Sequence, residues 1–198
     1  MKLIALGAFA LSTLASAAAA QTPAAAAQQQ ITHGAPLAGV CIYNAQRVLG
    51  QSTAGQALVS GMQRLGEEVR GELTPYATTI QTEATALQQA QAAGQPIDDA
   101  RRQAFQTRVQ EAQQLEQTRE NELRYTEAMQ TQTIGQAAQP IIIAVYQERG
   151  CSALLERSAV LIANPQMDIS DTVIQRLNAA LPTLSFNRMP VPVQQQQQ

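Results

Sequence analysis

Apolar residues recur at steps of three and four along the first half of the chain. This spacing places them in one narrow seam of a long helix, with Gln, Thr and Ala over most of the rest of its surface. Pro75 interrupts the helix, but the seam keeps its phase across it, so the pattern predicts one kinked helix rather than two. The seam consists of Leu58, Met62, Leu65, Val69, Leu73, Tyr76, Ile80, Ala84 and Leu87.

A second long helix follows a break in this pattern. Gly94 and Pro96 end the first helix, and Asp98 is placed to cap the next one. A helix of about 40 residues is ~60 Å long, which exceeds the diameter of a 150-residue globule, so the pair predicts a projecting arm over about residues 58–133. The second seam consists of Phe105, Val109, Ala112, Leu115, Leu123, Met129 and Ile134.

The second helix changes character before it ends at Gly150. Its segment "PIIIAVY" contains a second internal proline, Pro140, and is apolar almost all round. Such a segment is typical of a helix that has entered a packed body. We therefore expect a body formed by about residues 37–57 and 134–186 at the base of the arm.

Short apolar segments flank the arm and predict a small sheet. Residues 40–43 ("VCIY") indicate a buried strand, after which Ser52 or Thr53 caps the first arm helix. The segments "CSALLE" and "AVLIA" predict a strand hairpin joined around Arg157 and Ser158. Together they predict three short strands.

A short amphipathic helix is predicted to close the body. Asp168 or Ser170 serves as its N-cap and Pro182 as its stop. Its apolar face consists of Val173, Ile174, Leu177 and Leu181.

The ends of the chain differ from the folded unit at residues 37–186. Lys2, an apolar run and three alanines predict a signal peptide at residues 1–20, cleaved after Ala20. The alternative, an N-terminal membrane anchor, is disfavoured because the run is shorter than the ~20 residues of a membrane span. Ala, Gln and Pro dominate residues 21–36 and 187–198, which predicts disordered segments.

Composition excludes several classes of function. Lys2 is the only lysine, so cleavage changes the net charge from −2 to −3, which disfavours nucleic-acid binding. The only histidine, His33, lies in the leader, so His-based catalysis and metal binding are not expected. We predict no enzyme activity, no cofactor, and no catalytic, cofactor-binding or metal-binding residues. Four carboxylates could form an acid/base pair, but a solvated helix face is favoured for them: Glu116, Glu120, Glu122 and Glu127.

The chain resembles the Skp/OmpH family of periplasmic chaperones. The resemblance is strongest in "GVCIYNAQRVL" and in "ERGCSALLERSAVLIANPQMDISDTVIQRLN". It implies an α+β, mostly α fold, in which a coiled-coil-like helical hairpin projects from a three-stranded body, and a jellyfish-like homotrimer. The implied function is that of an ATP-independent periplasmic holdase, which binds unfolded outer-membrane β-barrel proteins and spans no membrane. The alternative is a structural coiled-coil spacer or scaffold of the cell envelope.

The charge of the arms departs from this family, whose members are commonly basic. Between residues 58 and 130 the chain has seven Arg and eleven Asp plus Glu, so the arms are net negative. No lipopolysaccharide site is carried over for this reason.

The two cysteines are predicted to form a disulfide. Cys41 and Cys151 are the only cysteines, each lies in or beside a predicted strand of one sheet, and export places them where thiols oxidise. The alternative is two buried free thiols. The residues that contact a client are not identified by the sequence.

Overall fold

The computed structural model describes residues 31–192. The chain divides into two units, residues 1–32 and 33–198, and all helices and strands of the described residues lie in the second unit. The predicted signal peptide, its cleavage after Ala20 and most of the predicted linker at 21–36 lie outside the described residues, as does the stretch 193–198.

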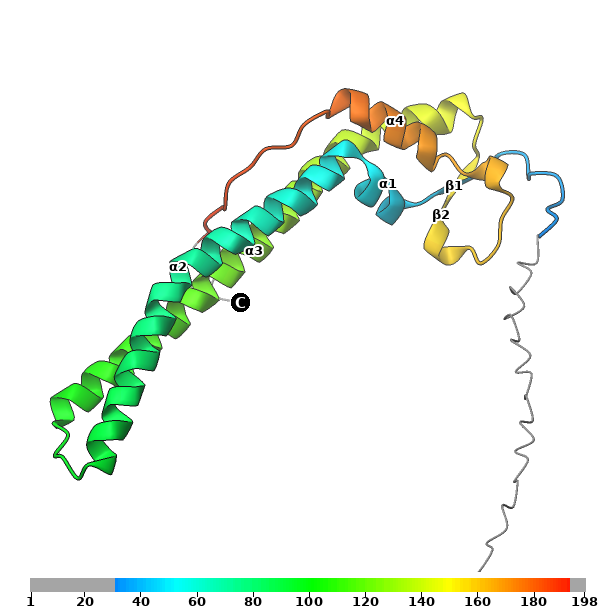
Figure 1. Ribbon diagram of the computed structural model, residues 1–198. Helices are drawn as coiled ribbons and strands as arrows, with labels where there is room; N and C mark the ends of the chain where they lie inside the picture. The colour runs from blue at the N-terminus through cyan, green and yellow to red at the C-terminus, as the bar shows by residue number, and fades with distance from the viewer. Residues whose placement is uncertain (1–30, 193–198) are drawn as a thin grey trace, which may run out of the picture. The chain divides into compact units, whose positions relative to one another are not determined.

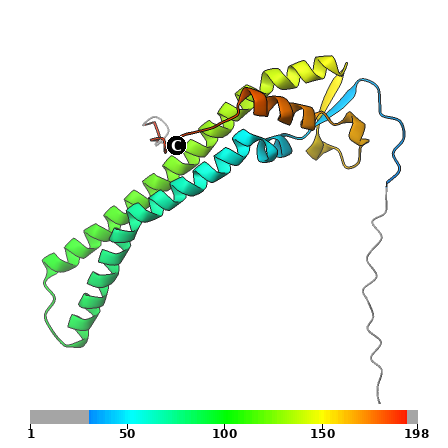
Figure 2. The same cartoon turned by 45° about the horizontal axis from the view of Figure 1, so that its top comes forward.

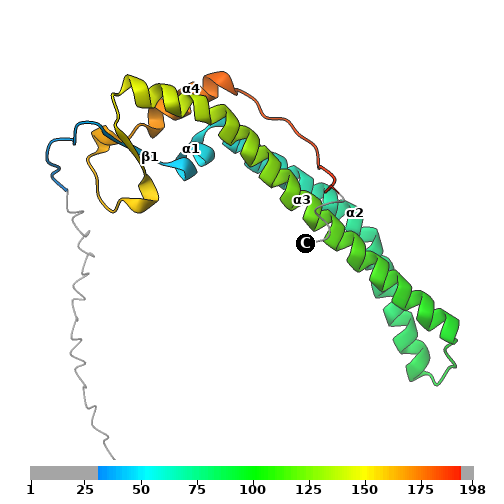
Figure 3. The ribbon, with the colours of Figure 1, turned by 180° about the vertical axis from the view of Figure 1, so that it is seen from behind.

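Two long helices form the predicted arm. Helices α2 (Thr53–Ala92) and α3 (Asp99–Glu148) lie side by side along most of their length (Figure 1). The first has 40 residues, as the sequence predicted, and therefore a length of ~60 Å. It continues through Pro75 without a break, and Figures 2 and 3 show that it bends in its distal part.

The ends of the arm helices follow local signals. The Ser52 hydroxyl accepts a hydrogen bond from the Gly55 amide at 3.1 Å, which decides between the two predicted caps. Asp98 accepts from the Ala100 amide at 3.1 Å. After α3, Gly150 has a φ of +63°, a conformation that favours glycine and ends the helix.

The sheet differs from the prediction. Strand β1 (Val40–Tyr43) pairs in parallel with β2 (Ala153–Glu156), so that Cys41 lies opposite Leu154. Among residues 31–192 the sheet has two strands, and an isolated parallel bridge joins Ile42 to Asp168. The predicted hairpin and third strand are therefore wrong.

The error has a physical reason. β2 reaches β1 after the long excursion of the arm, which serves as the crossover that parallel strands require. The next three residues form the 3₁₀ helix η1 (Arg157–Ala159), where the Arg157 guanidinium donates to the Val160 carbonyl. The rest of "AVLIA" has no strand partner among the described residues.

A short helix between β1 and the arm was missed. Helix α1 (Ala45–Gln51) is capped by Asn44, whose side chain accepts from the Arg47 amide at 2.9 Å. Its end lies very close to the start of α2, because a Cβ on Gly55 would lie 1.4 Å from the Leu49 carbonyl oxygen. Only glycine allows this approach.

The last helix, α4 (Ser170–Ala180), follows the 3₁₀ helix η2 (Pro165–Met167). Neither predicted residue occupies its cap position, which belongs to Ile169. Asp168 still accepts from the Ser170 amide at 2.8 Å, and the Ser170 hydroxyl accepts from the Asn44 amide at 2.8 Å. Ser170 therefore ties the start of α4 to the end of β1.

The core of the body joins the strands to all four α-helices of the described residues. The predicted face of α4 is correct, since Val173 and Leu177 are fully buried and Ile174 and Leu181 pack against the same cluster. The buried cluster consists of Cys41, Val48, Ala54, Leu58, Ile134, Ala138, Val145, Cys151, Ile169, Val173 and Leu177.

An extended segment follows α4 and runs along the arm (Figure 1). We call residues 183–192 the strap. The sequence predicted a disordered tail from residue 187, but Arg188 and Met189 make side-chain and backbone contacts with both arm helices. The prediction is therefore wrong for this part of the tail.

Candidate functional site

The arm seam is closed near the body and open toward the tip. Leu65 and Val69 are buried between the arm helices, and Leu58 joins the core of the body. Beyond Val69 no residue of the α2 seam is buried, and Tyr76 is 47% exposed. The seam of α2 is thus more accessible in its distal half, whereas Val59, which lies outside the seam near the body, is 57% exposed.

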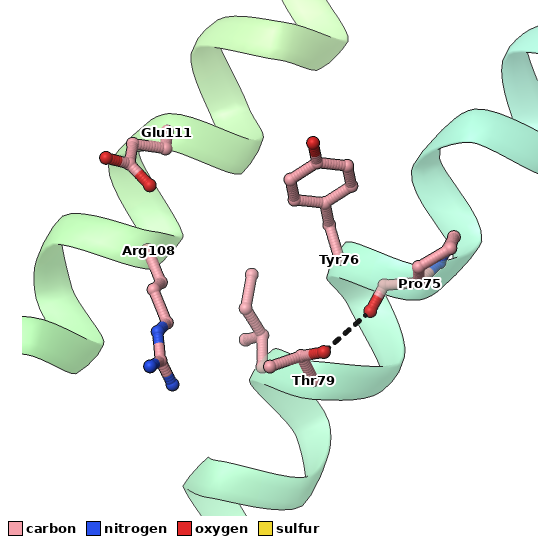
Figure 4. Close-up of a pocket in the computed structure, with 6 residues that line it drawn as sticks. Pro75, Tyr76, Thr79, Arg108 and Glu111 are labelled. Atoms are coloured by element: carbon pink, nitrogen blue, oxygen red, sulfur yellow. Dashed lines mark hydrogen bonds between the residues drawn. The ribbon is translucent and has the colours of Figure 1, made fainter.

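A hollow lies between the helices beside the internal proline. It has a volume of about 410 Å³, and its wall is mostly apolar. Figure 4 shows Tyr76 from α2 and the charged side chains of Arg108 and Glu111 from α3 around the same space. The Thr79 hydroxyl donates to the Pro75 carbonyl at 2.9 Å. Pro75 itself supplies no backbone donor, and the helices spread apart toward the tip (Figure 2).

The body has a second apolar surface. Leu161 is 91% exposed, Leu37 66% and Ile162 57%, and they lie in or next to segments that line a hollow of about 300 Å³ over the sheet. Several large apolar side chains exposed in one region are typical of an interaction surface. The segment "AVLIA", predicted as a strand, contributes to this surface instead. We call Leu37, Leu155, Val160, Leu161 and Ile162 the body patch.

The two cysteines form the predicted disulfide. Cys41 in β1 and Cys151 before β2 are joined, with their Cα atoms 5.7 Å apart. Both are buried in the core of the body, at 6% and 8% exposure. The bond therefore links the chain on either side of the arm and is not available as a surface thiol pair.

A ring of four charges lies where the strap crosses the arm. Arg119 contacts Glu72 at 2.8 Å and Glu122 at 2.9 Å. Arg188 of the strap contacts the same two carboxylates, at 2.8 and 3.0 Å. The hydrogen bond from Arg188 is the main cause that lowers the pKa of Glu72 below its ordinary value, and the charges of both arginines add to it.

The four carboxylates that could form an acid/base pair have two different environments in the structure. Glu116, Glu120 and Glu127 are exposed, as predicted for a solvated face. The side chain of Glu122 is only 12% exposed and belongs to the charge ring. The solvated-face prediction is wrong for Glu122, because its partner Arg188 is 66 positions away in the sequence and no local pattern reveals it.

Arginines near the tip are partly neutralised by neighbouring carboxylates. Arg101 donates to Glu83 at 2.8 Å and lowers the pKa of Glu83 below its ordinary value. Arg102 lies 3.4 Å from Asp99. These pairs neutralise part of the positive charge near the tip.

Two further features concern the described part of the chain. Within residues 31–192, no three His, Cys, Asp or Glu side chains come together in a way that could hold a metal ion. No helix in that range combines the length and the apolar character needed to cross a membrane. His33 lies in the coil before β1.

These features define a class: a small α+β body that carries a long helical hairpin with an open apolar seam. A family model described as "Outer membrane protein (OmpH-like)" matches residues 39–177. The chain belongs to this family, the Skp/OmpH family indicated by the terminal motifs.

One solved structure extends the comparison. A chain from Caulobacter crescentus, described as a candidate outer membrane chaperone (OmpH-like), is 36% identical, with a TM-score of 0.72. The match covers 83% of this chain and 98% of that one. No curated protein matches the sequence. Family and fold together support a chaperone role.

Proposed function

We propose that the protein is an ATP-independent periplasmic holdase, which binds unfolded outer-membrane β-barrel proteins and prevents their aggregation. Family membership supports a chaperone, and the open distal seam of the arm is the observation that carries the holdase assignment. Partly exposed apolar side chains offer many weak contacts to an unfolded chain without a fixed geometry. The proposal includes removal of residues 1–20 on export, no enzyme activity and no nucleic-acid partner, and it assigns no lipopolysaccharide site.

The same observation disfavours a spacer or scaffold. A rigid coiled coil needs continuous knobs-into-holes packing along its seam. Here Pro75 lies inside α2, and the residues around it line a hollow rather than a closed interface. An arm built in this way resists bending poorly but leaves apolar surface accessible.

An aggregation assay without nucleotide tests the holdase proposal. The wild-type protein should keep a denatured β-barrel client in solution when denaturant is diluted. Tyr76→Ser/Ile80→Ser should lose much of this effect, because it removes apolar surface from the distal hollow. Thr78→Ser/Gln81→Ser, at exposed positions of the same segment, is the matched control. Wild-type protein that leaves aggregation unchanged would refute the proposal.

We further propose that three copies assemble through the body patch. Leu161 is almost fully exposed in the single chain, and the outer edge of β2 pairs with no further strand among residues 31–192. Exposed strand edges and apolar side chains favour association with further copies of the same chain. Three arms around one body would then enclose a cavity for the client.

Sedimentation equilibrium tests the assembly. The protein should have three times the mass of the mature chain at micromolar concentration. Leu161→Asp should shift it toward the monomer, because it places a charge in the patch. Gln147→Asp, at an exposed position of α3, should leave the mass unchanged. A monomeric wild type would contradict the proposed trimer. It would not contradict the proposal that the apolar arm seam binds unfolded clients.

A further inference from the structure

The strap has the conformation of a bound peptide. Leu184, Phe186 and Arg188 are partly buried, whereas Ser185 and Asn187 between them are exposed. This alternation with a period of two is typical of an extended chain that presents one side to a surface. The surface in question is the proximal arm, formed by both α2 and α3.

Two contacts hold the backbone of the strap. Arg64 on α2 donates to the Phe186 carbonyl at 2.7 Å. The hydroxyl of Thr126 on α3, which is fully buried, accepts from the Met189 amide at 2.8 Å. Every residue has a backbone carbonyl and every residue except proline an amide, so these two contacts would serve many extended segments.

Two side-chain subsites add selectivity. The ring of Phe186 lies over Gly61, where an added Cβ would come within 2.5 Å of the ring. Two positions further along, the Arg188 guanidinium contacts Glu72 and Glu122. The space left by the missing side chain of Gly61 and a pair of carboxylates therefore accept an aromatic residue followed, after one intervening residue, by an arginine.

We propose that this surface of the proximal arm is a binding site for extended polypeptide segments with an aromatic-x-arginine pattern, and that the strap occupies it in cis. We call it the strap site. Segments of an unfolded protein bind there only after the strap leaves. The inference rests on the proposed function only where it identifies that unfolded protein as a client of the chaperone. The existence of the strap site does not depend on it.

Occupation in cis has a measurable consequence. A tethered segment competes at an effective concentration that reaches the millimolar range for short linkers. A free peptide must displace the strap, so its apparent affinity falls by the fraction of molecules in which the site is open. Releasing the strap should therefore strengthen binding of a free peptide by at least about ten-fold.

The test uses the full chain and a labelled peptide with the sequence of residues 182–192, measured by fluorescence anisotropy. Phe186→Ser/Arg188→Glu removes the two strap side chains that fill the subsites and leaves the arm intact. This released variant should bind the peptide at least about ten-fold more tightly than the wild type. A peptide with Glu in place of its arginine should not bind.

Two glycines of α2 provide a matched pair of controls. Gly61→Ala, added to the released variant, fills the aromatic subsite and should abolish peptide binding. Gly66→Ala makes the same change where nothing lies within 4 Å of the new Cβ, and should leave binding intact. Both substitutions raise the helix propensity of α2 by the same amount. A general effect on the stability of α2 would therefore change peptide binding equally in the two variants.

Three outcomes would overturn the proposal: no binding to the released variant, equal binding to the released variant and the wild type, or binding that Gly61→Ala leaves unchanged. Should the released variant fail to fold, the wild-type chain supplies a second measurement. Its Met189 amide should exchange slowly with solvent, because it donates to Thr126, and rapid exchange would also refute the proposal. The aggregation assay is independent of these results, so failure of the strap site and failure of the holdase function remain distinguishable.

Discussion

At the scale of single residues, Glu72 has the most informative position in the arm. It is bound by Arg119 from the neighbouring helix and by Arg188 from the strap, and both arginines also bind Glu122. Neighbouring charges around this ring always have opposite signs. Exposed ion pairs contribute little to stability individually, so the ring acts mainly by fixing where Arg188 lies.

The lowered pKa of Glu72 predicts how docking of the strap depends on pH. A carboxyl whose pKa is lowered by docking favours the docked state above its ordinary pKa, and this contribution is lost as the pH falls through the lowered value. The methyl NMR signal of Met189 should therefore stay in its docked position above the ordinary pKa of a Glu side chain, and move only as the pH falls below it. Arg188→Gln, which removes the partner, should make the position of this signal independent of pH in the same range. A transition between about pH 5 and 8 would contradict the role of the carboxylates.

At the scale of elements, the parallel pair β1 and β2 depends on contacts distant in sequence. The strands have four paired positions, and Cys41 and Cys151 are 110 residues apart. Bringing such distant segments together costs conformational entropy in a chain without a cross-link. The disulfide removes much of this cost by restricting the unfolded chain.

Loss of the disulfide should therefore destabilise the body strongly. Cys41→Ala/Cys151→Ala is expected to lower the free energy of unfolding by up to about 5 kcal/mol, measured by urea denaturation. A reducing agent should lower the stability of the wild type but not that of the double variant. Equal denaturation midpoints for the oxidised wild type and the variant would show that the cross-link contributes nothing.

Local signals were sufficient for the arm but not for the body. Pro75 and Gly150 act through their own backbone geometry and Asp98 through a local side-chain cap, so a short window of sequence reveals their roles. The apolar run "AVLIA" is equally compatible with a buried strand and with an exposed interaction surface, and the wrong alternative was predicted. Asn44 before α1 was a readable cap signal that was missed.

The strap shows more clearly that local sequence signals do not reveal contacts between residues far apart in the chain. The Pro and Gln content of residues 187–198 indicated disorder, although the alternation of Leu184, Phe186 and Arg188 was visible in the sequence. Period two alone does not identify a partner surface. The partner is formed by Gly61, Glu72 and Glu122, which come together only when α2 and α3 pack against each other.

At the scale of the whole molecule, the balance of charge decides how a client approaches. The arm region has four more acidic than basic residues between positions 58 and 130, seven Arg against eleven Asp plus Glu. Arg101 and Arg102 near the tip are paired with carboxylates. On the proposed holdase function, an acidic unfolded client should therefore be repelled at long range, while the apolar distal seam should attract it at contact.

The two forces respond differently to salt, which gives a prediction for capture. Screening beyond ~8 Å at physiological ionic strength weakens the repulsion and leaves apolar attraction almost unchanged. The association rate of an acidic client, measured by stopped-flow fluorescence, should stay constant or rise between low and physiological salt. A steep fall in the rate would instead show that arginines such as Arg101, Arg102 and Arg108 govern capture.

The bond between Cys41 and Cys151 also has a consequence for proteolysis. It joins the chain just before the arm to the chain just after it, so the backbone of the whole arm is part of a covalent ring. A protease that cuts once at the tip, for example beside Gly94, opens this ring without dividing the molecule. Nicked protein should therefore migrate as one species in a non-reducing gel and as two fragments after reduction, and both arm helices stay attached to the body after damage at their most exposed point.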